Sequence, residues 1–130
     1  MKPAVTPVFL LLAALAAPAA AEWTEVGGNE QVTFYVDNAT RAVQGDKASM
    51  WMLVSSKKPR SNGDLKFSSI RTRFEFDCSA KRVRELETHF HAGEKADGAV
   101  VGGYTEPTDW EELPEGTVKN EVAQLACAKD

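Results

Sequence analysis

Four side chains that are able to ligate a metal ion alternate within one short segment: Glu85, Glu87, His89 and His91. In a β-strand these residues share one side, with alternate residues about 6.6–7 Å apart. Imidazole nitrogens suit zinc, copper or nickel, and carboxylate oxygens can complete the shell. The pattern makes His89, His91 and Glu87 candidate ligands of a metal- or haem-binding protein. The alternative is a solvated sheet face whose charged groups form cross-strand ion pairs.

The sequence does not assemble the residues of a catalytic site. Both histidines share one segment, and no serine lies in a nucleophile-elbow pattern. The glycine-containing stretch 98–103 lacks the Lys-Ser/Thr pair of a phosphate-binding loop and precedes no helix. We therefore expect a non-enzymatic protein without a cofactor. Aromatic side chains could line a ligand groove, although in a small domain they more often belong to the core. These are Trp23, Trp51, Trp110, Tyr35 and Tyr104.

Two groups of basic residues are candidates for contact with a protein partner. Lys57, Lys58 and Arg60 lie in a polar stretch, 55–65, whose composition predicts a mobile, solvated loop. Arg71 and Arg73 lie on the exposed side of the strand that follows. We expect the partner to be a host or envelope protein.

The charge of the chain is unevenly distributed. The net charge is −4 at pH 7, which disfavours general nucleic-acid binding. Basic residues prevail within 57–84, and acidic residues prevail within 106–121. Such a layout can steer a charged partner, or the two regions can neutralise each other on a solvated surface.

Period-two alternation of apolar residues predicts that most of the chain is β-sheet. The predicted strands are 31–37, 40–43, 47–55, 68–78, 82–91 and 99–104. The third of these is apolar on both sides, which is typical of a central strand. In the fourth strand Phe74, Phe76 and Cys78 share the buried side. Arg71 and Arg73 then face Glu85 and Glu87 across a hairpin, where opposite charges stabilise an exposed sheet face.

From Thr117 onward the apolar period changes to that of a helix. Val118, Val122, Leu125 and Ala126 recur at helical spacing, and Thr117 is a suitable N-cap. The sequence therefore predicts an α+β fold in which about six antiparallel strands carry one C-terminal helix on one face.

The first 21 residues have the pattern of a secretory signal peptide. Lys2 precedes a short apolar run, 8–17, and the small residues 19–21 provide a cleavage site after Ala21. The run is too short for a membrane-spanning helix, which needs about 20 apolar residues, although an uncleaved anchor is the alternative. We expect one mature domain over 22–130 with no transmembrane segment, located in a Gram-negative periplasm or secreted. Because no cysteine lies near the cleavage site, it is not expected to be a lipoprotein.

The two cysteines, Cys78 and Cys127, are predicted to form a disulfide, because an exported chain folds in an oxidising compartment. The bond would clamp the end of the helix onto the buried side of the sheet. The alternative is a pair of free or metal-binding thiols.

The order of short motifs resembles the surface-adhesin protein E-like family of small exported bacterial domains. The resemblance runs from Trp23 to Cys127 and rests on the order of 35–37, Trp51, 76–78, 81–84, Trp110 and 113–117. It implies a mainly antiparallel sheet whose C-terminal helix is held by the disulfide, and a non-enzymatic, adhesin-like role. The named adhesins bind host matrix proteins and are displayed through a lipid. This chain lacks the lipid-bearing cysteine, which favours the periplasm. The resemblance identifies no binding residue.

Overall fold

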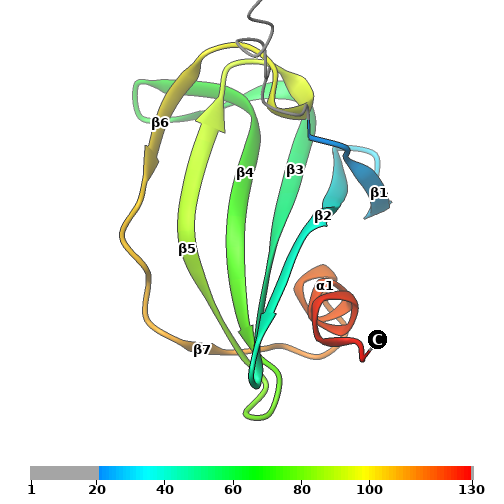
Figure 1. The fold of residues 1–130 in the computed structure, drawn as a ribbon. Helices are drawn as coiled ribbons and strands as arrows, with labels where there is room; N and C mark the ends of the chain where they lie inside the picture. Colours follow the sequence, from blue (N-terminus) through cyan, green and yellow to red (C-terminus); the bar gives the residue numbers. More distant parts are fainter. Residues whose placement is uncertain (1–20, 130) are drawn as a thin grey trace, which may run out of the picture.

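Residues 21–129 form one curved antiparallel sheet with one α-helix packed on it (Figure 1). A computed structural model describes residues 21–129, so all of the predicted signal peptide except Ala21 lies outside the described residues. The strands are β1 (Thr24–Gly28), β2 (Val32–Gln44), β3 (Lys47–Asn62), β4 (Leu65–Asp77), β5 (Arg82–His91), β6 (Val100–Tyr104) and β7 (Glu111–Glu112). A 3₁₀ turn, η2 (Glu94–Ala96), and the helix α1 (Val118–Cys127) complete the fold.

The sheet follows the order of the sequence, β1-β2-β3-β4-β5-β6, and β7 pairs with the start of β5. Each strand is antiparallel to its neighbour, so short connections suffice. The predicted antiparallel sheet with a C-terminal helix is confirmed, and β3 is central as expected. The strand set differs in three places: β1 and β7 were not predicted, and 40–43 is not a separate strand but part of β2.

β2 is continuous where the sequence predicted two strands, 31–37 and 40–43, separated after Asp37. The Asp37 carboxylate accepts a hydrogen bond from the Ala39 N–H at 3.1 Å, and Thr40 Oγ1 donates to the Asp37 carbonyl at 2.7 Å. Thr40 Oγ1 also accepts from the Trp51 N–H of β3 at 3.0 Å. The pairing of β2 with β3 shifts across this segment and then resumes. The turn-forming residues therefore make a bulge rather than a reversal.

The predicted mobile loop at 55–65 is instead part of a long hairpin. Residues 57–67, here called the hairpin arm, extend β3 and β4 and turn at Gly63, whose φ of +64° suits glycine. Phe67 packs edge-on against Phe90 of β5, with ring centroids 4.8 Å apart. Leu65 lies so close to Gly102 of β6 that a Cβ there would approach it to 3.1 Å. These apolar contacts order a stretch whose composition alone is typical of a loop.

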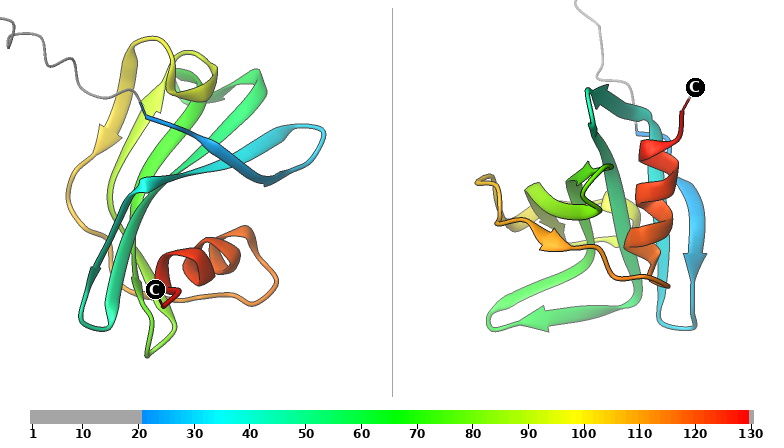
Figure 2. Two further views of the ribbon diagram at one scale, coloured as in Figure 1. Left: turned by 45° about the vertical axis from the view of Figure 1, so that its right-hand side comes forward. Right: turned by 90° about the horizontal axis from the view of Figure 1, so that it is seen from below.

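α1 covers one side of the sheet, here called the helix face (Figure 2). Its Val122, Ala123 and Ala126 are buried against strand residues. The strand side of this core consists of Val36, Ala48, Met50, Met52, Phe74, Phe76 and Val83. Thr117 caps the helix as predicted, since its side chain accepts from the Asn120 N–H at 3.3 Å. Leu125, predicted on the apolar stripe, is 44% exposed, because the buried stripe is centred on Val122 and Ala126.

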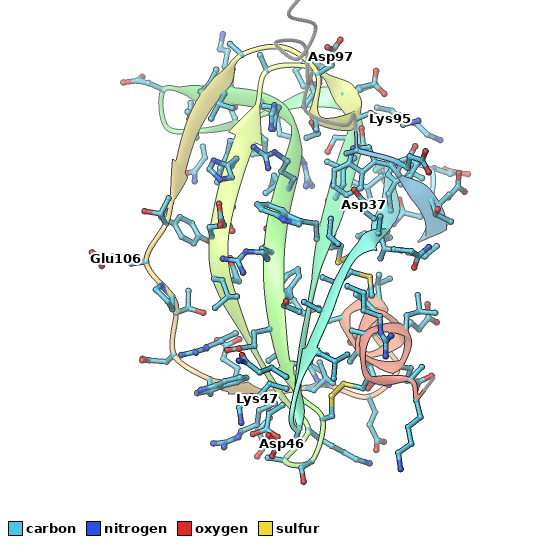
Figure 3. The ribbon with its side chains drawn as sticks, viewed as in Figure 1. Asp37, Asp46, Lys47, Lys95, Asp97 and Glu106 are labelled. Atoms are coloured by element: carbon cyan, nitrogen blue, oxygen red, sulfur yellow. A yellow bond between two sulfur atoms is a disulfide. The ribbon has the colours of Figure 1, made fainter. Side chains whose placement is uncertain are left out.

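A disulfide joins Cys78, just after β4, to Cys127, the last residue of α1. The two Cα atoms are 5.8 Å apart, and Figure 3 shows the bond beside the helix. Arg41 of β2 holds the residues on either side of Cys127, because its side chain donates to the carbonyls of Ala126, at 2.8 Å, and of Ala128. The C-terminal segment is therefore fixed to the sheet covalently and by hydrogen bonds.

We predict that the double variant Cys78→Ser/Cys127→Ser unfolds much more easily than the parent. The bond closes a loop with a sequence separation of 49, and a loop of this length is expected to contribute about 4 kcal/mol to the free energy of unfolding. Urea unfolding measured by circular dichroism tests this. Reductant should shift the parent's midpoint and leave the variant's unchanged; a parent midpoint that ignores reductant would contradict the prediction.

Candidate partner-binding surface

The side of the sheet opposite α1, here called the outer face, carries most of the polar residues that the sequence singled out. Strand register determines their neighbours. Trp51 of β3 is opposite Arg73 of β4, which in turn is opposite Glu87 of β5. One step along, Arg71 is opposite His89. Residues predicted separately as partner contacts and as metal ligands thus lie together on one surface.

Trp51 lies at the centre of this surface. The Arg71 guanidinium carbon is 4.8 Å from the centroid of the indole ring, which is a cation–π distance. The His89 ring is roughly parallel to the indole, at an interplanar angle of 30° and a centroid separation of 6.0 Å. The Trp51 ring therefore contacts side chains of both β4 and β5 on the outer face.

Glu87 of β5 bonds both Arg73 of β4 and His89 of its own strand on the outer face. Its Oε2 accepts from Arg73 Nη2 at 3.2 Å, and its Oε1 accepts from His89 Nε2 at 2.9 Å. The hydrogen bond from His89 and the nearby Arg73 charge hold the pKa of Glu87 below its usual value. The predicted cross-strand pairing of Arg73 with Glu87 is confirmed.

Glu85 does not join this network, contrary to expectation. The register shifts between Arg73 and Phe74, so Glu85 is opposite Phe74 and lies on the helix face. There its Oε1 accepts from Thr88 Oγ1 at 3.0 Å and from the Tyr104 hydroxyl. A one-residue bulge in β5 sends Glu85 and Glu87 to opposite sides of the sheet, which alternation alone cannot predict.

His91, at the end of β5, is 6% exposed. Its Nε2 accepts from Arg71 Nε at 2.9 Å, so the ring proton lies on Nδ1, which has no hydrogen-bond partner among the described residues. Burial lowers the pKa of His91, and the charges of Arg71 and His89 lower it further. The Gly98 backbone and the Asp97 carboxylate act in the opposite sense. The buried ring is therefore neutral near pH 7.

The structure gives no support to a metal site at Glu87, His89 and His91. Within residues 21–129, no three His, Cys, Asp or Glu side chains are grouped so that they could hold a metal ion. His89 bonds Glu87, whereas His91 is buried and bonds Arg71. Glu87 and His91 of the alternating pattern thus pair with the arginines of β4.

The third group of candidates lies apart from the outer-face network. Lys57, Lys58 and Arg60 are on the hairpin arm, where all three are exposed. Within the described part of the chain, none of them has a carboxylate within 4.0 Å or lies over an aromatic ring. The predicted partner contacts therefore fall into two groups. The three basic residues of the arm have no ion pair among the described residues, whereas Arg71 and Arg73 already contact Trp51 and Glu87.

Sequence reasoning missed the cover over one end of the outer face. The Lys95 N–H in η2 donates to Ser55 Oγ, and the Ala96 N–H donates to Ser69 Oγ, both at 2.9 Å. The Lys95 ammonium lies 5.1 Å from the ring centroid of Tyr35 on β2. Figure 3 shows Lys95 and Asp97 together at this end of the sheet. Consecutive serines in the strands were the only signal in the sequence.

A meandering antiparallel sheet with one disulfide-tethered C-terminal helix defines the chain as a small α+β domain, mostly sheet. The chain belongs to the surface-adhesin protein E family, whose model matches residues 23–128. This match confirms the resemblance that the sequence motifs indicated. Comparison with curated protein sequences finds no match.

Solved structures of Haemophilus influenzae protein E have a similar fold. One covers 88% of this chain and 91% of its own, with a TM-score of 0.62 and 17% sequence identity. Protein E from non-typeable H. influenzae covers 88% of this chain and 82% of its own, with a TM-score of 0.59 and 17% identity. The selenomethionine form covers 74% and 79%, with a TM-score of 0.59 and 16% identity. At this identity the likeness establishes the fold.

We predict that the protein loses stability as the pH falls below about 6.5, the ordinary pKa of histidine. The pKa of His91 is lowered in the folded state, so the unfolded chain binds a proton that the folded protein excludes, and acid favours unfolding. Urea unfolding at a series of pH values between about 5 and 8 measures the slope.

The variant His91→Gln should have a shallower slope over this interval. His89→Gln is the comparison variant: it removes a smaller contribution to the lowered pKa of His91 and keeps burial and Arg71, so its slope should stay closer to the parent's than that of His91→Gln. Equal slopes for the parent and His91→Gln would rule out this role of the buried ring.

Proposed function

We propose that this protein is an exported, non-enzymatic binding module that recognises an acidic surface of a protein partner through its hairpin arm. The arm carries Lys57, Lys58, Arg60 and Lys66 against a single carboxylate, Asp64, and all five residues are exposed. Positive charge that is not neutralised within the molecule is available to a partner and steers its approach.

The contrast with the engaged basic residues on and beside the sheet carries the proposal. Arg73 pairs with Glu87, and Arg84 pairs with Glu75 at 2.8 Å. Arg71 lies over Trp51, and Lys47 pairs with Asp46 at 3.2 Å. Since these charges are engaged within the sheet, Arg71 and Arg73 are secondary contacts in the proposal.

Family membership supports the adhesin-like part of the proposal, because the family is that of surface-adhesin protein E. The disulfide supports export, since such bonds persist in oxidising compartments. No helix within residues 21–129 has the length and apolar character needed to cross a membrane. The proposed location is the periplasm or the outside of the cell, after removal of residues 1–21.

We predict that the charge-reversal variant Lys57→Glu/Lys58→Glu/Arg60→Glu loses partner binding. The mature protein is immobilised and exposed to envelope extract and to purified matrix proteins, and captured proteins are identified by mass spectrometry. For a partner captured by the parent, the variant should bind about tenfold more weakly, because three surface charge pairs of roughly 0.2–1 kcal/mol each are lost.

The matched control is Lys81→Glu, which reverses an exposed lysine in the turn between β4 and β5. It should retain the parent's affinity, and the affinity of the parent should fall as salt is added. Equal capture by the parent and the arm variant would exclude the arm as the contact surface.

A further inference from the structure

An apolar groove lies on the helix face, beside the beginning of α1 and away from the outer face. Its volume is about 360 Å³, near the lower end of the roughly 300–1,000 Å³ range of ligand pockets. Phe34, Val54 and Ile70 line it from three neighbouring strands, and Val118 and Lys119 line it from the helix.

The groove exists because α1 is shorter than the apolar side of the sheet. Phe34 is opposite Val54, which is opposite Ile70, so the three form one row across β2, β3 and β4. This row continues the surface that α1 buries, yet all three side chains are only partly buried. The part of this apolar row that α1 leaves uncovered is in contact with water. A ligand that covers it removes apolar surface from water, which is favourable.

One positive charge stands at this groove. The Lys119 ammonium is 5.4 Å from the ring centroid of Phe74, which also lines the cavity. Within residues 21–129, no carboxylate lies within 4.0 Å of that ammonium. The groove thus combines an apolar wall with an ammonium group that forms no ion pair within 4.0 Å among residues 21–129.

We infer that this groove binds a free fatty acid. The acyl chain lies along the row Phe34–Val54–Ile70, and the carboxylate pairs with Lys119. The small volume suits one linear chain, and the unpaired ammonium selects an anionic headgroup over a neutral or cationic one. The site is independent of the hairpin arm, because its lining residues lie on β2–β4, on α1 and in the segment just before α1, all outside residues 57–67.

Decanoate and the uncharged 1-decanol, each below its micelle-forming concentration, are the probes. Binding is followed by amide shifts in two-dimensional NMR spectra and by calorimetry. We expect decanoate to shift amides around Phe34, Val54, Ile70 and 117–119. Lys119→Met should weaken decanoate binding about two- to fivefold, the size expected for a partly exposed ion pair, and should leave 1-decanol binding unchanged.

Two variants separate the groove from other effects. Val54→Thr keeps a β-branched residue of similar size in the strand and should weaken both probes, because it puts a hydroxyl into the apolar row. Lys81→Met is the matched lysine control and should bind decanoate as the parent does. The arm variant should also retain decanoate binding, so that failure of the arm proposal is distinguishable from failure of this one.

Three results would overturn the inference. In the first, decanoate shifts amides outside the groove or shifts none. In the second, Lys119→Met binds decanoate as tightly as the parent, or decylamine binds as tightly as decanoate. In the third, the groove amides shift with protein concentration alone, which would identify a second copy of the chain as the occupant.

Discussion

The fold depends on covering one apolar side of a sheet with a helix of only 10 residues. A helix of this length is marginal in water by itself, since nucleation is costly and few hydrogen bonds repay it. Three constraints hold it in place: the disulfide from Cys127 to Cys78, the hydrogen bonds from Arg41, and the cap at Thr117. Because the tether fixes the end of the helix at the β4–β5 turn, the helix can bury only the adjacent rows of the sheet. The open row of Phe34, Val54 and Ile70 follows from that position.

Local periodicity was sufficient to predict the strands of the central sheet and the helix. It failed where tertiary contacts outweigh composition. The arm is polar and reads as a loop, but Phe67 and Leu65 meet Phe90 and Gly102, which are distant in the sequence. At Asp37 the same side-chain hydrogen bonds that begin a turn instead form a bulge, because β3 continues to pair with β2 on both sides of it.

Prediction of the candidate site was limited by register. The pairing of Arg73 with Glu87 follows from two strands joined by a tight turn. Glu85 lies on the helix face instead of the outer face because of the bulge in β5. One extra residue in a strand moves the side chains that precede it to the opposite side of the sheet. The central place of Trp51 was not predictable, because apolar residues on both sides of β3 give no indication of which side is covered by a helix.

The two sides of the sheet differ in whether their cations are already neutralised by a carboxylate, and this difference decides which cations are available to a ligand or partner. On the outer face Arg71 and His89 occupy the Trp51 ring, and Glu87 neutralises Arg73, so the surface is satisfied internally. On the helix face Lys119 approaches Phe74 without an anion within 4.0 Å among residues 21–129. A guanidinium that already has a carboxylate or ring must lose that contact before it binds a partner, and the lost contact offsets the gain. Among residues 21–129 the arm cations have neither contact to break, and Lys119 has only the ring of Phe74, so the free energy of a new ion pair is offset less there.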